Sequence, residues 1–161
     1  EEDATSGQAI EYDSVEEKFL AKDGKIDDIS AGFDTEGNYY VVAPRQQLIL
    51  KKSLYESMPK KVIKCEGMTS ESSTSGLVID DDFGYLLTGN GIYGGKLDAN
   101  EWEKKIDGKE LYYCKDFPSP VLGIANMAKA PGRDLEFYMM TWKNAECSDF
   151  EWVHYFAGKK P

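Results

Sequence analysis

The sequence has few basic residues and no long apolar run, and each shortage excludes a class of function. Its 161 residues include 19 Lys and Arg against 29 Asp and Glu, which gives a net charge of −10. A chain this acidic lacks the basic surface that binds a nucleic-acid backbone or an anionic membrane. No apolar stretch approaches the roughly 20 residues that span a bilayer. We therefore expect neither nucleic acid nor membrane among its partners.

Cysteine is also scarce. Cys65, Cys114 and Cys147 leave at least one thiol unpaired within the chain, and their spacing does not decide which two would pair. No Cys-x-x-Cys occurs, which argues against a zinc ribbon or a thioredoxin-like motif. The first residue is Glu1 instead of Met, which indicates removal of a signal or pro-segment, or excision from a longer chain. We predict a secreted or extracytoplasmic protein.

Short runs of β-forming residues, separated by turns rich in glycine, asparagine and aspartate, make up most of the chain. The clearest stretch is 75–102, where an acidic turn and a Gly-Asn-Gly turn separate apolar runs. Such a pattern is typical of consecutive antiparallel strands. We predict that the turns 80–82 and 89–91 border one strand, 85–88, in a hairpin arrangement. Other runs with strand character are 39–42, 47–50, 58–65, 103–106, 111–114, 121–127, 135–142 and 150–156.

The chain is predicted to contain one domain. Residues 1–12 are acidic and small without periodicity, which indicates a flexible tail, and 13–161 form a single all-β repeat domain. The segment 13–23 fits either a helix or a strand. We favour the strand, because the next segment resembles the one after a strand in a repeat.

A repeat emerges when the turn glycines are aligned. Gly37 in DTEGNYYVVA and Gly84 in DDDFGYLLTG occupy the same place, which Leu135 takes in GRDLEFYMMT. An apolar strand precedes each phrase, and a strand with a charged start follows it: PKKVIKC, EWEKKI and FEWVHYF. The segment EEKFLAKDG, before the first unit, resembles these closing strands. A repeat of roughly 50 residues with about four strands is the size of a propeller blade.

The phrases ISAGFDTEGNYYVVA and GLVIDDDFGYLLTGNGIY resemble the inner two strands of blades in six-bladed β-propellers, the family of NHL-type repeats and related lactonases. This resemblance implies an all-β fold of about three four-stranded propeller-like repeats. A single antiparallel β-barrel or sandwich with evenly spaced hairpins is the alternative. The metal-ligand pattern of the lactonases is missing, so no lactonase site is carried over.

The blade interpretation has a consequence for assembly. Three blades are too few to close a ring, because propellers use about four to eight. The chain would then self-associate or have a partner chain, and a stable monomer near 18.1 kDa would contradict blades.

Clustered carboxylates at Asp80, Asp81 and Asp82 form a candidate metal site, since hard cations prefer oxygen ligands. An EF-hand loop beginning at Asp80 would need Glu at its twelfth position, where Gly91 stands. The site would therefore be of another type, and a solvated turn between strands is the plainer interpretation. The predicted cofactor is none, or calcium at this turn.

Aromatic residues recur with the strands, and most are expected in the core. Some could line a pocket mouth for a sugar or an aromatic ligand; the candidate ligand-binding residues are Tyr93, Trp102, Trp142, Trp152 and His154. His154 is the single histidine. It alternates with Trp152 and Phe156 if 150–156 is a strand, and a packed or hydrogen-bonded role is the plainer interpretation.

Motifs for catalysis are weak. The literal GxGxxG match at 89–94 leads into a turn and a strand instead of a helix, so we interpret it as a hairpin turn. No nucleophile-elbow sequence occurs. We predict a non-enzymatic module that binds a small ligand or a protein within an oligomer or larger assembly. The alternatives are a cation-dependent hydrolase of the six-bladed type and a barrel that binds a small apolar ligand.

Overall fold

The computed structural model describes residues 29–44, 46–55, 59–69, 77–133 and 135–156. The predicted tail 1–12 and the ambiguous segment 13–23 lie outside these residues. The described elements are β1 (Ile29–Phe33), β2 (Asn38–Ala43), β3 (Leu48–Ser53), β4 (Pro59–Lys64), β5 (Leu77–Asp80), β6 (Phe83–Thr88), β7 (Gly91–Lys96), β8 (Glu103–Asp107), the 3₁₀-helix η2 (Gly108–Glu110), α2 (Pro120–Gly123), β9 (Ile124–Lys129), β10 (Glu136–Trp142) and β11 (Phe150–Phe156). Neither described helix is long and apolar enough to cross a membrane.

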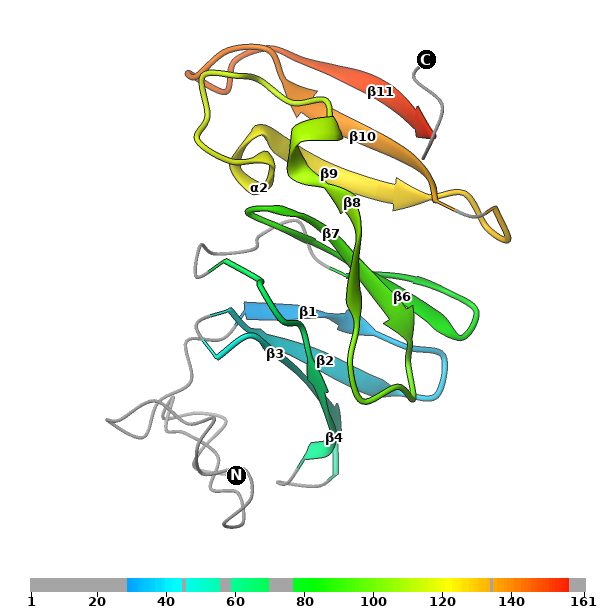
Figure 1. Ribbon diagram of the computed structural model, residues 1–161. Coiled ribbons are helices and arrows are strands. Elements are labelled where there is room, and N and C mark those ends of the chain that lie inside the picture. Colours follow the sequence, from blue (N-terminus) through cyan, green and yellow to red (C-terminus); the bar gives the residue numbers. More distant parts are fainter. Residues whose placement is uncertain (1–28, 45, 56–58, 70–76, 134, 157–161) are drawn as a thin grey trace.

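The strands form three antiparallel sheets, which confirms the all-β prediction. Their strand orders are β1-β2-β3-β4, β5-β6-β7-β8 and β9-β10-β11. The sheets are stacked in chain order, with the second sheet between the first and the third (Figure 1). No sheet of the described strands closes on itself, so these strands do not form the barrel of the alternative prediction. They also make three layers, whereas a sandwich has two.

The aligned phrases occupy equivalent places in the stack. They form β2, β6 and β10, the second strand of each sheet. Leu86 packs toward the first sheet, in the same cluster as Tyr40, while Leu87 packs toward the third sheet beside Phe137. The first strands are also neighbours, since β5 contacts both β1 and β9. Each sheet therefore repeats the placement of the sheet before it.

Two sequence expectations are wrong. The run 111–114 forms no strand, because the N–H of Leu111 donates to Gly108 O and ends the 3₁₀-helix there. FEWVHYF is not a fourth, closing strand like β4 and β8; as β11 it pairs directly with β10 and takes the third position. The physical reason is its pairing with β10 over all seven residues, in which Tyr155 stands opposite Phe137, His154 opposite Tyr138 and Phe150 opposite Trp142. The third sheet accordingly has three described strands where four were expected.

The run 121–127 is divided between two elements. Pro120 stands in the first turn of α2, where its missing N–H and fixed φ do no harm. Gly123 then ends this single turn, and β9 begins at Ile124. A Cβ on Gly123 would lie 2.7 Å from the ring of Tyr113, so the close approach requires glycine.

Two apolar layers hold the stack together. Tyr40, Leu86, Tyr93 and Trp102 fill the layer between the first and second sheets. The layer between the second and third contains Tyr85, Leu87, Ile92, Ile106, Phe137 and Met139. Such burial stabilises by about 1.5–3 kcal/mol for each fully buried large side chain.

The predicted hairpin around 85–88 is confirmed. β6 pairs with β5 on one side and with β7 on the other, and the literal GxGxxG match lies in the β6–β7 turn and β7. Gly91 has φ = 144°, and a Cβ there would lie 2.1 Å from the carbonyl oxygen of Ile106. This turn therefore needs glycine both for its conformation and for space.

All three cysteines are free thiols. Cys65 and Cys114 are buried and Cys147 is exposed. Burial raises the pKa of the Cys65 thiol to about 12, so this group stays protonated and unreactive near neutral pH.

Candidate functional site

Exposed aromatic side chains gather on the outer face of the third sheet. Tyr138, Phe150 and Trp152 are 43%, 49% and 59% exposed. Residues alternate between the two faces of a strand, and Phe137 and Met139 of β10 point into the core. Tyr138 must therefore point the other way, away from the second sheet. This outward surface is the candidate site.

The register of the β10–β11 hairpin assembles the rest of this surface. Tyr138 stands opposite His154, Met140 opposite Trp152, and Trp142 opposite Phe150. The rings of Tyr138 and His154 are stacked with centroids 4.2 Å apart, and those of Trp142 and Phe150 meet edge to face at 6.0 Å. We define the open face by eight residues: Glu136, Tyr138, Met140, Trp142, Phe150, Trp152, His154 and Phe156.

The one carboxylate on the open face, that of Glu136, has two side-chain partners. Glu136 is only 7% exposed, and its Oε1 lies 2.8 Å from Nε2 of His154. Its Oε2 lies 3.3 Å from Nε of Arg133. The open face therefore presents aromatic and apolar surface with no unpaired acid, although the whole chain carries −10.

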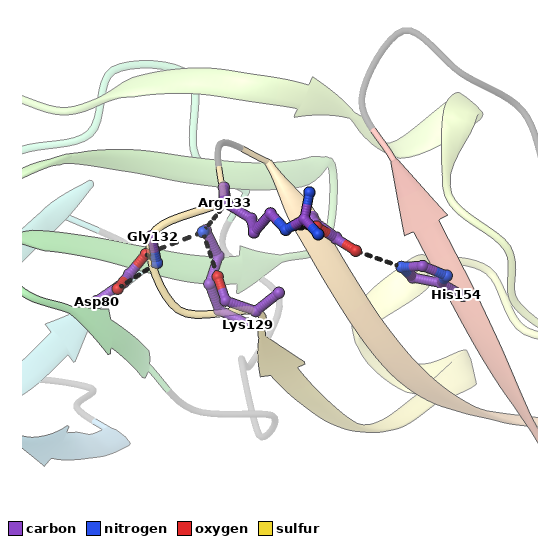
Figure 2. A network of polar contacts seen from close by, with 7 residues as sticks. Asp80, Lys129, Gly132, Arg133 and His154 are labelled. Atoms are coloured by element: carbon purple, nitrogen blue, oxygen red, sulfur yellow. Dashed lines mark hydrogen bonds and ion pairs between the residues drawn. The ribbon is translucent and has the colours of Figure 1, made fainter.

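A buried lysine fastens the third sheet to the second (Figure 2). Nζ of Lys129 lies 3.0 Å from Oδ2 of Asp80 at the end of β5, and its side chain is 1% exposed. The same ammonium donates to the carbonyl oxygens of Ala130 and Arg133, so all three of its N–H groups have acceptors. Gly132 N–H also donates to the Asp80 carboxylate, at 3.0 Å. These contacts hold the β9–β10 turn against β5.

This arrangement bears on the candidate metal site. The hydrogen bond from Lys129 lowers the pKa of Asp80, and the bond from Gly132 N–H adds to it against the raising effect of burial. A carboxylate that already has an ammonium partner is a weak ligand for a second cation. Asp81 and Asp82 are exposed, and the described residues contain no group of three or more metal-ligand side chains. The calcium site stays a prediction without geometric support.

The five candidate ligand-binding residues are divided between two places. Trp142, Trp152 and His154 come together on the open face. Tyr93 and Trp102 are 2% and 3% exposed and lie between the first and second sheets. There the Trp102 indole rests on Gly84 and Gly95, where an added Cβ would come within 2.4 Å of the ring. These two aromatics therefore belong to the interior.

Sequence reasoning missed the other members of the open face: Glu136, Tyr138, Met140, Phe150 and Phe156. A signal for them existed. Residues 138, 140 and 142 and residues 150, 152 and 156 are large and apolar at even spacings, and a short connection joins the two runs. Alternation in both strands of one hairpin places all of these side chains on one face.

A shallow hollow of about 450 Å³ lies beside Trp102. It is open to solvent and carries both signs of charge; its lining residues are Glu66, Gly94, Gly95, Glu101, Trp102, Glu103, Lys104 and Lys105. Because the indole is almost fully covered, this hollow offers little apolar surface to a ligand. The open face is the stronger candidate.

The first sheet also has a face that points away from the second sheet. We define it as the sealed face, by the four residues Val41, Ala43, Leu48 and Leu50, which form a cluster of their own. Their exposed fractions are 8%, 1%, 2% and 1%. These four side chains therefore offer almost no apolar surface to a partner; the exposed large apolar residues described in the first sheet and its turns are Phe33, Leu54 and Tyr55.

No protein-family model matches this sequence, and no curated protein matches it either. The geometry of the open face and of its surroundings is therefore what supports a function.

Proposed function

We propose that the chain is a non-enzymatic binding module of propeller-like sheets that docks onto a partner protein through the open face. The observation that carries this proposal is the exposure of Tyr138, Phe150 and Trp152 side by side on one sheet face. Contiguous apolar patches on soluble proteins often mark interaction sites. Tyr and Trp are the residue types most enriched where binding energy concentrates.

The size of the patch limits what it achieves alone. Large aromatic side chains bury about 150–250 Å² each, so three half-exposed ones present about 300 Å². At about 25 cal/mol per Å², covering them contributes about 7 kcal/mol. Association costs about 4–15 kcal/mol in lost freedom. The aromatic patch therefore needs further contacts around it to hold a lasting complex.

The repeat supports a place in a larger assembly. Each sheet is an antiparallel meander, and the first strands of neighbouring sheets contact each other. Equivalent strands therefore lie at equivalent places in the stack. In a row of propeller blades, the outward face of the last sheet is the one that the next blade covers. A partner that supplies such a layer, from another chain or another copy, fits the open face.

Light scattering over a range of concentrations tests the docking role. At high concentration the chain's own copies should occupy the open face weakly, so the average mass should rise above 18.1 kDa. Trp152→Asp places a charge in the centre of the open face and should abolish this rise. Tyr55→Asp is the matched control, because Tyr55 is 94% exposed in the turn after β3, outside the open face.

Comparison of the two variants distinguishes docking through the open face from non-specific association. Loss of association in Trp152→Asp with retention in Tyr55→Asp supports docking through the open face. Equal masses for the parent chain and Trp152→Asp at every concentration would contradict it. A parent chain that stays at 18.1 kDa up to about 1 mM would count against the blade interpretation as well, because unpaired blades should seek neighbours.

The cation-dependent hydrolase is the alternative that calcium calorimetry tests. Tight stoichiometric binding with a raised melting temperature would favour it over a metal-free binder. We expect no such binding, because the carboxylate of Asp80 already has Lys129 and Gly132 as partners.

A further inference from the structure

The third sheet differs from the other two at its outer edge. The first and second sheets have a fourth strand beyond the third one, β4 beside β3 and β8 beside β7. In the third sheet, β11 holds the third position, and no described strand pairs with its other side. The edge of β11 therefore corresponds to the edges that β4 and β8 cover in the sister sheets.

The two fourth strands carry features that discourage further pairing. β4 begins with Pro59 and contains three lysines, and its register with β3 shifts near one end. β8 carries Lys104 and Lys105 and has a register shift opposite β7. The loop before β8 also covers the end of β4, where Lys64 N–H donates to Asn100 O at 2.8 Å. Lysine, proline and irregular register are the usual protections of an edge strand.

β11 has none of these protections. It runs for seven residues, from Phe150 to Phe156, without proline, lysine or arginine. All seven residues pair with β10 in one unbroken register. A long, regular, aromatic strand with an unprotected edge is a template for another strand. This observation is independent of the exposed aromatic face.

Charge indicates which kind of strand would fit. Glu146, Asp149 and Glu151 lie at or just before the start of β11, and all three are exposed. Asp149 has Lys143 at 3.6 Å, whereas no ion pair of the described residues involves Glu146 or Glu151. A neighbouring strand would place a side chain directly beside Glu151, and opposite charges in such cross-strand pairs are stabilising.

We propose that the edge of β11 takes a fourth strand from a partner protein, an extended lysine-bearing segment that pairs antiparallel with β11. The sister strands have this composition: β4 is PKKVIK and β8 is EKKID. The added strand would supply backbone hydrogen bonds and would widen the open face. This inference rests on the proposed function, because the same partner would cover both edge and face.

A synthetic peptide with the β4 sequence, Pro-Lys-Lys-Val-Ile-Lys with blocked ends, serves as the probe. Amide hydrogen exchange of the whole chain is followed by NMR at millimolar peptide. We expect exchange to slow in Phe150–Phe156 by about tenfold or more at saturation, since edge amides gain acceptors. A peptide of the same sequence with N-methylated alternate amides is the control for backbone pairing, and it should give no protection.

Charge reversal tests the class of partner. Glu151→Lys should weaken binding of the lysine peptide about fivefold, the equivalent of one cross-strand ion pair. The same variant should bind a peptide with Glu in place of Lys better than the parent chain does. Glu103→Lys is the matched control on another edge, since Glu103 is an exposed residue of β8. It should leave binding at β11 unchanged.

Two outcomes with the peptides would overturn the proposal: the parent chain binds the Glu peptide as well as the Lys peptide, or the N-methylated peptide protects β11 as well as the unmodified one. Protection of β4 or β8 instead of β11 would also overturn it. So would protection of β11 that rises with protein concentration without peptide, because the edge would then belong to a second copy. Failure here differs from failure of the proposed function. Light scattering of Trp152→Asp reports on the face, whereas amide exchange in β11 reports on the edge.

Discussion

The two ends of the three-sheet stack differ in how their outward faces meet water. On the sealed face, Leu50 is 1% exposed and Val41, its most exposed member, only 8%. On the open face, Trp152 is 59% exposed although Met140 opposite it and Phe150 beside it are also large and apolar. The same strand pattern thus produces interior at one end and surface at the other.

This difference shows that an apolar strand pattern does not by itself indicate the core. The sealed face contains only aliphatic side chains of small and medium size, whereas the open face contains Trp142, Trp152 and stacked rings with a polar tip, such as Tyr138 and His154. Aromatic residues with a polar group tolerate partial exposure and are suited to interfaces. The composition of the two faces therefore agrees with a core role for one and a docking role for the other.

The largest expected effect comes from charging the sealed face. Leu50→Asp should destabilise the fold by about 5 kcal/mol, because it removes a buried apolar side chain and places a carboxylate in an aliphatic cluster. Leu54→Asp is the matched control, since Leu54 is 58% exposed, and it should change stability by less than about 0.5 kcal/mol. Denaturant unfolding measures both, and similar values for the two variants would erase the distinction between the faces.

Replacing Gly91 in the central sheet, which both ends share, should have the next largest effect. Gly91→Val should cost about 3 kcal/mol, because valine is strained at φ = 144° and its Cβ would clash with the carbonyl of Ile106. Hydrogen exchange should show the loss in all three sheets alike. A neutral effect on thermal stability would contradict this turn geometry.

Lys129, which joins the third sheet to the second, allows the two ends of the stack to be destabilised separately. Lys129→Met should cost about 2 kcal/mol, because Asp80 loses its ammonium partner and the carbonyl groups of Ala130 and Arg133 lose their donor. Amide exchange in β9–β11 should speed up more than in β1–β4. Uniform acceleration over the whole chain would show that this contact does not hold the open end separately.

Acid should weaken the same junction. The pKa of Asp80 is lowered by Lys129, so its contribution to stability is complete above the unfolded value near 3.9 and is lost as pH falls through the lower folded value. Asp80→Asn should flatten part of the stability profile below about pH 4. Denaturant midpoints of both proteins at several pH values measure this, and identical profiles would contradict the assignment.

Asp34 gives a comparison for that titration in the first sheet. Burial alone would raise the pKa of Asp34, but hydrogen bonds from Asn38, from Tyr40 and from the N–H of Glu36 outweigh burial and lower it. The contribution of Asp34 to stability therefore depends on pH in the same direction as that of Asp80, and it is lost as pH falls. Because the described partners of Asp34 lie in its own turn, in β2 and in β3, Asp34→Asn should leave exchange in β9–β11 unchanged at low pH.

The smallest expected effect is on the open face. Trp152→Asp should change the free energy of unfolding by less than about 0.5 kcal/mol, since most of the ring is already in water. It should nevertheless abolish self-association. A loss of more than about 2 kcal/mol would mean that Trp152 supports the fold of the single chain and would weaken the docking proposal.

The sequence by itself determined most of the strands and their turns, although 111–114 forms no strand. Runs such as 39–42 and 85–88 consist of β-forming residues and are bounded by turns of Gly, Asn and Asp. Local backbone preference is sufficient to place such strands. The sequence also determined the repeat, because the phrases aligned on Gly37, Gly84 and Leu135 form the second strand of each sheet. The Gly91 turn followed from the same chemistry.

Only the tertiary structure decided which apolar residues form a surface. Trp102 and Trp152 are the same residue type in similar strand-rich segments, yet one rests on Gly84 and Gly95 between two sheets and the other faces water. It also made β11 the third strand of its sheet instead of the fourth, through its register with β10. Burial and pairing depend on contacts between residues far apart in the chain, and local sequence pattern does not encode those contacts.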